Sequence, residues 1–511
     1  MNIIKIFFSL FIISLGIINL NAKNLQLASI YNHNMVIQRE KKIPVWGWAA
    51  PNTKVTVKFK NQQVSTISNQ FGEWKLELQP LEADSTKSQM NVTSSGESCT
   101  LSNILVGEVW LCSGQSNMEW PVSKSASGKT IRKPAMTKPI RLLKQRKHKT
   151  GYRLKGFWAH WKSAAPAVVD GFSAVGFYFA LELYEKLQVP IGIIQCAWGG
   201  SAIEPWTPPE GFASVPELKT YSAQIEKAEK AYQKDLKTFL PYWSRWVKKA
   251  EKQVSSRQKI SPATIQFPQH ALKKWGLPTN IFNAMVAPIV PFPIRGVIWY
   301  QGESNRWDGK NYFYKMKALI NGWRKEWNEE DLPFYFVQIC PYKYKKAGIL
   351  PQLWQGQYRA AAEIPNCEII SAVDYGEVNN IHPANKYPVG KRLALMALAK
   401  SYKLKVAMHK YPVFKSIKTA DNKLIIHIEN SNGGLKTNDN KAVREFQIAG
   451  KDNKYYPAKA KISNNKITLI SPKVSNPEKV KYAWHNQANP NVVNQEGLPL
   501  LPFFKSKSKN D

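Results

Sequence analysis

Residues 104–118 read ILVGEVWLCSGQSNM, and this stretch decides how the middle of the chain is interpreted. Its first eight residues are mostly apolar, which is typical of a strand buried on both faces of a sheet, and Gly114 then marks a turn. Similar apolar runs recur at 189–197, 294–300, 334–339 and 369–373, and helical patterns fill 172–187, 312–327 and 389–402. This alternation predicts an α/β fold in which a parallel sheet carries helices on both faces.

The two flanks of this region follow a different pattern. Short alternating segments with Asn- and Gly-containing turns, such as KVTVKF at 54–59 and KLIIHIE at 423–429, indicate β-rich modules. We therefore predict an N-terminal β domain over 23–102, a central domain over 103–404 and a C-terminal β-rich region over 405–505. A helical insertion is expected around 214–260, because apolar residues recur there every three or four positions, and Pro241 is expected to end that helix.

Length and composition are those of an ordinary globular protein. The chain has 511 residues, 43% of them apolar and 21% charged, which excludes a largely disordered chain. Residues 1–22 combine Lys5, an apolar run and Ala22, the pattern of a secretory signal peptide. We therefore expect export to the periplasm or the exterior, with no membrane insertion after the signal is removed.

The five cysteines are widely spaced and predict neither a disulfide framework nor a zinc site. Cys112, Cys196 and Cys340 lie in or at the end of apolar runs, so we interpret them as buried thiols that pack like small hydrophobic side chains. The sequence leaves open whether one pair is bridged.

Residues suited to acyl transfer follow the predicted strands. Ser116, the pair Gly199-Gly200, Asn305 and His382 each come after a different apolar run. Sites in open α/β sheets form at the carboxyl ends of the strands, so these residues should meet. Each alone has an ordinary explanation as a cap, a turn or a surface side chain. Together they predict Ser116 as nucleophile, His382 as its base, and an oxyanion hole from the Ser116 amide, Gly200 and Asn305.

Three central segments carry a resemblance to a known family. Residues 107–118 (GEVWLCSGQSNM) resemble the signature of the sialate O-acetylesterases, which belong to the wider SGNH (GDSL-type) hydrolases. Residues 299–305 (WYQGESN) and 381–383 (IHP) resemble further blocks of that family. Similar segments near both ends extend the resemblance over nearly the whole mature chain; they are 35–39 (MVIQR), 44–47 (PVWG) and 497–499 (GLP).

The resemblance implies an SGNH-type central domain and a serine esterase. Such an enzyme removes O-acetyl groups from a carbohydrate, sialic acid or another acetylated glycan, through an acyl-enzyme and without a metal or cofactor. By position in the family motifs, the resemblance implies that Ser116 is the nucleophile and His382 its base. It also implies that Gly200 and Asn305 contribute to the oxyanion hole.

One position departs from the family pattern. SGNH hydrolases commonly carry an Asp three residues before the His, and Asn379 stands there in this chain. An Asn can orient an imidazole but does not stabilise imidazolium as a carboxylate does. Asp374, our preferred candidate, or Glu377 could fill that role from further back; otherwise the enzyme works as a Ser–His dyad. Glu303 is interpreted as a buried acid that ties loops together.

The departure at Asn379 also keeps a rival function open. The chain could be a carbohydrate-binding protein with a degraded esterase site, although the joint presence of Ser116, Asn305 and His382 argues against this. A lipid esterase is disfavoured because the wide apolar lid that it would need is not evident.

Charge is strongly unbalanced, with 72 Lys and Arg against 36 Asp and Glu. Thirteen of the basic residues lie between Glu119 and Asp170, a stretch that holds no acid. This stretch is either a solvated basic face or a patch that steers an anionic glycan to the site. Nucleic acid is not an expected partner, because no binding motif accompanies the charge. The expected partner is an acetylated glycan. Five tryptophans lie near the motifs; most of them are expected in the core, and one or two could stack on a sugar ring. They are Trp158, Trp161, Trp198, Trp206 and Trp307.

Overall fold

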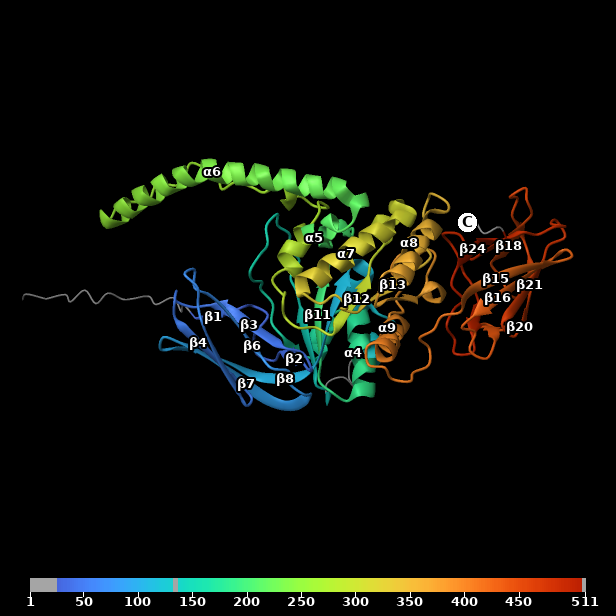
Figure 1. Cartoon of the computed structure of the whole chain (residues 1–511), viewed down its shortest axis with the longest axis horizontal. Coiled ribbons are helices and arrows are strands. Elements are labelled where there is room, and N and C mark those ends of the chain that lie inside the picture. The colour runs from blue at the N-terminus through green and yellow to red at the C-terminus, as the bar shows by residue number, and fades with distance from the viewer. Residues whose placement is uncertain (1–24, 132–136, 508–511) are drawn as a thin grey trace, which may run out of the picture.

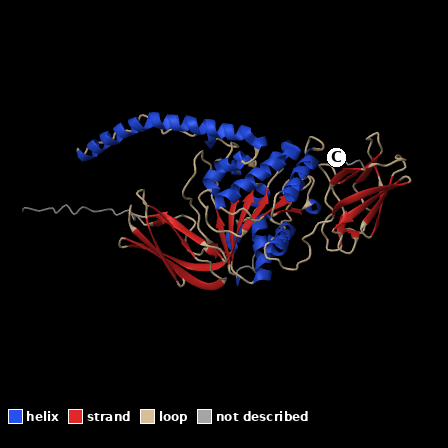
Figure 2. Cartoon of the chain, in the orientation of Figure 1, coloured by secondary structure: helices blue, strands red, loops and turns tan. Residues whose placement is uncertain are grey.

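The computed structural model describes residues 25–131 and 137–507 and shows three regions in chain order (Figures 1 and 2). Strand-rich regions lie at opposite ends of a central region of mixed helix and strand. The predicted signal peptide, residues 1–22, lies outside the described residues. The mixed α/β class and the β-rich ends agree with the sequence-based prediction.

The central sheet contains all of the predicted apolar runs. Its strands pair in parallel in the order β9-β11-β8-β12-β13-β14, and β10 (Lys162–Ser163) adds an antiparallel edge. The bounds of the parallel strands are β8 Glu97–Gly114, β9 Ile140–Lys144, β11 Ile191–Ala197, β12 Gly296–Tyr300, β13 Phe334–Gln338 and β14 Cys367–Ser371. The sequence did not indicate β9, because its short apolar interior lies within the basic stretch.

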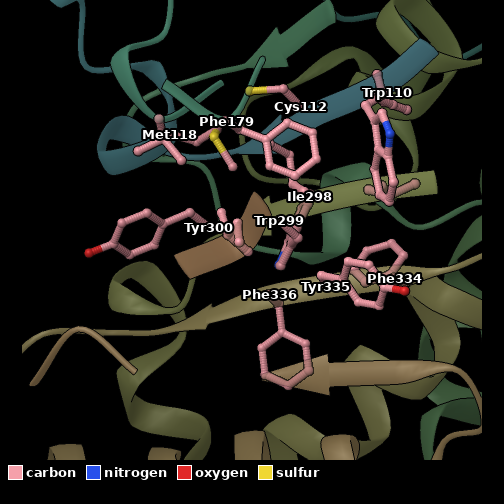
Figure 3. Packing of buried hydrophobic residues seen from close by; sticks show 14 of the residues in the cluster. Trp110, Cys112, Met118, Phe179, Ile298, Trp299, Tyr300, Phe334, Tyr335 and Phe336 are labelled. Carbon is pink, nitrogen blue, oxygen red and sulfur yellow. The ribbon is translucent and has the colours of Figure 1, made fainter. Parts of the chain in front are cut away.

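Helices pack around this sheet in two groups. Helix α4 (Ala174–Leu187) packs against α9 (Tyr387–Lys400), and α7 (Tyr312–Trp327) packs against α5 (Pro209–Ala213) and α8 (Ile349–Glu363). Three of these helices match the predicted helical patterns to within two residues at each end, whereas α5 and α8 were not predicted. The core between sheet and helices is rich in aromatic side chains, as Figure 3 shows around Trp110, Phe179 and Trp299.

The 18-residue strand β8 joins the N-terminal region to the central sheet. Its first part pairs with β2 (Val36–Gln38) and β7 (Asp84–Ser94), and its second part pairs with β11 and β12. The predicted boundary at 102/103 therefore lies within a continuous strand. Beside it, the fully buried Glu108 forms ion pairs with Arg39 and Arg295, which hold the two regions together.

Antiparallel strand pairs form both ends of the molecule, and some of the N-terminal strands belong to the same large sheet as β8. The remaining N-terminal strands are β1 Gln26–Leu27, β3 Ile43–Trp48, β4 Lys54–Phe59, β5 Gln62–Ile67 and β6 Glu73–Leu78. The C-terminal strands are β15 Val413–Ala420, β16 Lys423–Glu429, β17 Leu435–Thr437, β18 Phe446–Ala449, β19 Tyr456–Pro457, β20 Lys459–Ser463, β21 Lys466–Ile470, β22 Lys479–Tyr482, β23 Val492–Asn494 and β24 Phe503–Ser506.

The helical insertion is a single long helix, α6 (Lys219–Ser255), whose second half projects away from the central domain (Figure 1). The prediction that Pro241 ends the helix is wrong, because α6 continues for 14 residues beyond it. Proline removes one main-chain hydrogen bond and favours a bend, and Figure 1 shows α6 curving along its length. On an exposed helix the freed carbonyl can face water, so the helix tolerates the proline.

The described residues also show where the cysteines lie, whether metal-ligating side chains gather, and whether a helix could span a membrane. The side chains of Cys112, Cys196, Cys340 and Cys367 are buried, as predicted for three of them, and none of these four forms a disulfide. No His, Cys, Asp and Glu side chains of the described segments gather in a group of three that could hold a metal ion. None of the described helices is both long and apolar enough to cross a membrane.

Candidate active site

A tight turn after β8 places Ser116 at the carboxyl edge of the central sheet. The strand ends at Gly114, and Ser116 begins helix α1 (Ser116–Glu119). Gly114 has a φ of +137°, and a Cβ added to it would lie 2.2 Å from the carbonyl oxygen of Tyr300 on β12. Only glycine allows this close approach of the two backbones, so the sharp change of direction before Ser116 depends on it.

The His382 side chain meets Ser116 from the loop between β14 and α9. Its Nε2 atom lies 2.8 Å from Ser116 Oγ, within hydrogen-bond reach. The imidazole stacks on Trp120, with ring centroids 5.1 Å apart and an angle of 23° between the planes. The structure thus brings together the two residues predicted as nucleophile and base, although their chain positions are far apart.

The surroundings of His382 favour its neutral form. Burial lowers the pKa of His382 below its ordinary value, and the positive charge of Lys386 lowers it further. An imidazole with a lowered pKa is uncharged at neutral pH and has a free lone pair for the serine proton. The electrostatics of the site therefore suit a general base.

Asp374, the preferred candidate for orienting His382, does not reach it. Its two carboxylate oxygens each accept a hydrogen bond of 2.7 Å from Arg392, and both side chains are buried. This prediction is corrected: the neighbouring guanidinium on α9 holds the carboxylate in a two-point ion pair. No carboxylate of the described residues hydrogen-bonds to the His382 ring.

Glu377, the second candidate, shapes the loop that carries His382. Its carboxylate accepts hydrogen bonds of 3.0 Å from the Asn380 side chain and from the main-chain N–H of Ala384. Asn380 in turn accepts a hydrogen bond from the main-chain N–H of His382. Glu377 therefore acts on the backbone around His382 and not on the imidazole itself.

The glycine turn after β11 passes close to Ser116. A Cβ added to Gly199 would lie 3.3 Å from the Cβ of Ser116. The Gly199 amide donates a hydrogen bond of 2.7 Å to the Glu119 carboxylate. The amides of Ser116 and Gly200 have no acceptor within the described part of the chain, so these two predicted donors stay available to a ligand.

Asn305, the third predicted oxyanion donor, is fully engaged within the protein. Its Nδ2 atom donates to the carboxylates of Glu204, at 3.0 Å, and Asp308, at 2.8 Å. Its Oδ1 atom accepts from Gln301 and from the main-chain N–H of Ile203. Because a side-chain amide has only two N–H bonds, the structure leaves none for an oxyanion. The prediction for Asn305 is corrected accordingly.

A buried hydrogen-bond network lies under the site, and sequence reasoning predicted only its Glu303 member. Lys386 donates to Asn117 Oδ1, and Asn117 Nδ2 donates to Glu303 and to the carbonyl oxygen of Ile381, next to His382. Burial lowers the pKa of Lys386 to about 8 and raises the pKa of Glu303. This network ties together the segments that carry Ser116 and His382. The position of Glu303 agrees with its interpretation as a buried acid that ties loops together. In the sequence, the signal for this network was the presence of polar residues within otherwise apolar blocks.

Part of the basic stretch borders a cavity beside the site. The cavity has a volume of about 770 Å³, and its lining includes Glu119, Lys144, Arg146, His160 and Lys162. The Glu119 carboxylate forms a 2.6 Å ion pair with Lys147 in addition to its bond with Gly199. Trp158, with an exposed fraction of 81%, also contributes to the lining. Other members of the stretch pair with distant acids, as Arg153 does with Glu326.

The chain is similar to sialate O-acetylesterases in sequence and to a carbohydrate acetylesterase in structure. Sialate O-acetylesterase of Rattus norvegicus is 26% identical over 90% of this chain and 89% of its own length, and that of Homo sapiens is 26% identical over 84% and 79%. The crystal structure of a carbohydrate acetylesterase from Xanthomonas citri superimposes with a TM-score of 0.78 at 29% identity, covering 94% of this chain and all of that one.

A family profile described as carbohydrate esterase, sialic acid-specific acetylesterase matches residues 106–245 and 268–399. The matched segments contain Ser116, the glycine turn, the WYQGESN block and His382. The chain is therefore a carboxylic ester hydrolase and belongs to the sialic acid-specific acetylesterase family of carbohydrate esterases.

Proposed function

We propose that this protein is an exported serine acetylesterase that removes O-acetyl groups from an anionic glycan through an acyl-enzyme. The observation that carries the mechanism is the 2.8 Å contact between Ser116 Oγ and His382 Nε2. Membership of a carbohydrate acetylesterase family supports the substrate class. Export rests on the signal-peptide pattern of residues 1–22.

Acylation begins when Ser116 Oγ attacks the acetyl carbonyl carbon while its proton moves to His382 Nε2. The tetrahedral intermediate then collapses, the bond between the carbonyl carbon and the sugar oxygen breaks, and His382 returns the proton to that oxygen. A water molecule, deprotonated by His382, then attacks the acetyl-serine. The bond between the carbonyl carbon and Ser116 Oγ breaks, acetate leaves, and His382 returns the proton to Ser116 Oγ. Because no described carboxylate holds the imidazole, Ser116 and His382 work as a dyad, with Trp120 fixing the plane of the ring.

Negative charge on the acetyl oxygen is stabilised by main-chain amides. Those of Ser116 and Gly200 fit this role, because the Gly199 amide is already used by Glu119 and the Asn305 side chain by two carboxylates. Preorganised amide donors of this kind contribute a large part of the catalysis in acyl transfer. Glu119 supports the arrangement, because its carboxylate fixes the glycine turn beside the nucleophile.

The anionic character of the glycan is proposed from the basic cavity. Lys144, Arg146, His160 and Lys162 line it, and Glu119 is shared between this cavity and the site. An acidic group of the substrate would be attracted there, while Trp158 offers an exposed ring for a sugar face. This supports the second interpretation of the basic stretch over a purely solvated face.

The mechanism is tested with Ser116→Ala, measured as acetate release from an acetylated glycan. We expect a loss of at least about a thousandfold in kcat, because removing the nucleophile leaves only binding and the oxyanion donors. Mass spectrometry of the wild-type enzyme, quenched during turnover, should locate an acetyl group on the peptide that contains Ser116. A variant that keeps near wild-type activity, or an acetylated peptide elsewhere, would refute the assignment.

A further inference from the structure

The projecting half of α6 and the segment that returns along it carry large aromatic side chains that stay partly exposed. Tyr242 and Trp243 have exposed fractions of 48% and 39%, and Phe267, on the returning segment, is 50% exposed. Exposed aromatic clusters of this kind usually mark a binding surface. Part of it, residues 246–267, lies between the two segments matched by the family profile.

These rings are fixed in place around a hollow. Trp243 packs between Phe239 and Trp246, with ring centroids 5.5 and 4.8 Å apart. The Trp246 indole N–H donates a hydrogen bond of 2.9 Å to the Ser261 carbonyl, which ties the helix to the returning segment. The hollow between them has a volume of about 240 Å³ and is also lined by Tyr242.

The charge around the hollow is positive. Arg245 and Lys249 line it, and neither forms an ion pair with a described residue. Arg245 lies over the Tyr242 ring, with its guanidinium carbon 4.6 Å from the ring centroid. Between residues 242 and 259 six basic residues stand against one acid, Glu251. The surface therefore combines aromatic faces with two cations, Arg245 and Lys249, that have no acidic partner among the described residues.

From this combination we propose that the hollow is a second, non-catalytic site for an acidic sugar unit of a polyanionic glycan. Aromatic faces stack on the C–H face of a sugar ring, and Arg245 and Lys249 supply donors and charge for a carboxylate or sulfate. A membrane surface is disfavoured, because the rings pack on one another around a concave site with polar lining from Ser261 and Thr264. The proposal rests on the proposed function only for the choice of an anionic glycan.

A polymer held by α6 would stay near the active site between turnovers. Two binding sites on one molecule raise the effective concentration of the polymer at the second site. The hollow therefore contributes to the apparent affinity for long substrates and not to the chemistry at Ser116.

The test is binding of polygalacturonate, an unacetylated polyuronate, measured by titration calorimetry on the full-length mature protein. Trp243→Ala, and separately the double variant Arg245→Gln/Lys249→Gln, should weaken binding about tenfold, which corresponds to about 1.4 kcal/mol. The control, Lys227→Gln/Lys230→Gln, removes the same charge from the first half of α6 and should bind like wild type. The exposed Leu240→Ala is the control for the tryptophan, and circular dichroism checks that α6 stays helical.

Kinetics separate this proposal from the proposed function. The hollow variants should raise KM for acetylated polygalacturonate with kcat unchanged, and should leave hydrolysis of 4-nitrophenyl acetate unchanged. Equal polymer affinity in all variants would overturn the second site while leaving the esterase intact. Binding of phosphatidylglycerol vesicles in place of the polymer, or self-association that the hollow variants abolish, would also overturn it. Failure of the proposed function would instead appear as a wild-type enzyme that releases no acetate.

Discussion

At the scale of single residues, the sequence predicted the contact between Ser116 and His382 but not the groups that orient the imidazole. Ser116 and His382 meet as expected, but the acid expected to orient the imidazole is bound to Arg392 instead. Stacking on Trp120 and the main-chain bond to Asn380 hold His382 in place. This arrangement makes different predictions for Asp374 and for the groups that do surround the histidine.

Asp374→Asn should act on stability and not on chemistry. Removing one partner of a buried ion pair leaves the other charge uncompensated, which costs about 3–5 kcal/mol. We therefore expect denaturant unfolding to show a large loss of stability, with kcat of the folded enzyme within a few-fold of wild type. Glu363→Gln, which breaks the exposed pair with Arg359, is the control and should change stability little. A folded Asp374→Asn enzyme with kcat lowered a thousandfold would restore Asp374 to the catalytic group.

The pH dependence of kcat/KM should report the electrostatics around His382. Its pKa is lowered, so activity should persist below pH 6.5 and fall only as the imidazole becomes protonated. Lys386→Met removes a positive charge that disfavours imidazolium. The acid limb should therefore move to higher pH, but not all the way to the ordinary value, because burial of the imidazole lowers the pKa more than Lys386 does.

Lys400→Met is the control for this experiment. Lys400 stands at the far end of the same helix and pairs with Glu368, so its loss should leave the profile in place. An acid limb that stays put in Lys386→Met, or moves to lower pH, would contradict the assigned effect of Lys386.

At the scale of elements, the turn between β8 and α1 is the most constrained connection in the site. β8 and β12 approach so closely at Gly114 that no side chain fits between them. The same turn starts helix α1, whose first residue is Ser116. Packing of the two strands and placement of Ser116 are therefore set by one residue.

Gly114→Ala should damage both stability and activity. The added Cβ would meet the Tyr300 carbonyl at 2.2 Å in a backbone conformation that side chains rarely adopt, so either strand must shift. We expect a stability loss above about 2 kcal/mol and a strong fall in kcat, measured by thermal unfolding and acetate release. Gly171→Ala, where nothing lies within 4 Å and φ is −89°, is the matched control and should be nearly neutral. Equal behaviour of the two variants would show that the close approach is not required.

At the scale of the whole molecule, charge is arranged around the active site and along α6. The basic cavity adjoins Glu119, and the projecting half of α6 carries a second set of cations. Exposed charges act over about 8–10 Å at physiological salt, so each set acts locally. An anionic polymer is long enough to use both, whereas a small neutral ester uses neither.

Activity on an acetylated anionic polymer should therefore fall as salt is added, while turnover of a small neutral acetyl ester should barely change. Arg146→Gln/Lys162→Gln, in the cavity lining, should lower polymer turnover at low salt and weaken its salt dependence. The control Lys459→Gln/Lys461→Gln removes equal charge from exposed positions of β20 in the C-terminal region. If both substrates respond alike to salt, the basic cavity has no part in substrate binding.

The sequence by itself determined those strands, helices and site residues that local patterns of apolar and polar residues mark. Continuous apolar runs and the helical period located β8, β11, β12, β13 and β14 and three of the helices, because burial on both faces leaves a clear signature in the chain. The residues that follow those runs include Ser116 and His382, which meet in the structure because parallel strands end at a common edge. The role of Gly200 stays a prediction. Sequence patterns failed for short or charged elements. Strand β9 was not predicted because it lies among basic residues, and the end of α6 was misplaced because an exposed helix tolerates Pro241.

Only the tertiary structure decided which polar groups pair. In the structure Asp374 pairs with Arg392, Asn305 bonds to two carboxylates, and the Gly199 amide bonds to Glu119. Except for Asn305 and Asp308, these partners are not close neighbours in the sequence. A buried charged or amide group bonds to the partner that the packing brings within about 3 Å. The free-energy cost of leaving such a group unpaired is larger than the net stabilisation from the bond. Sequence spacing does not fix that distance, so the list of candidates could be read from the chain but their partners could not.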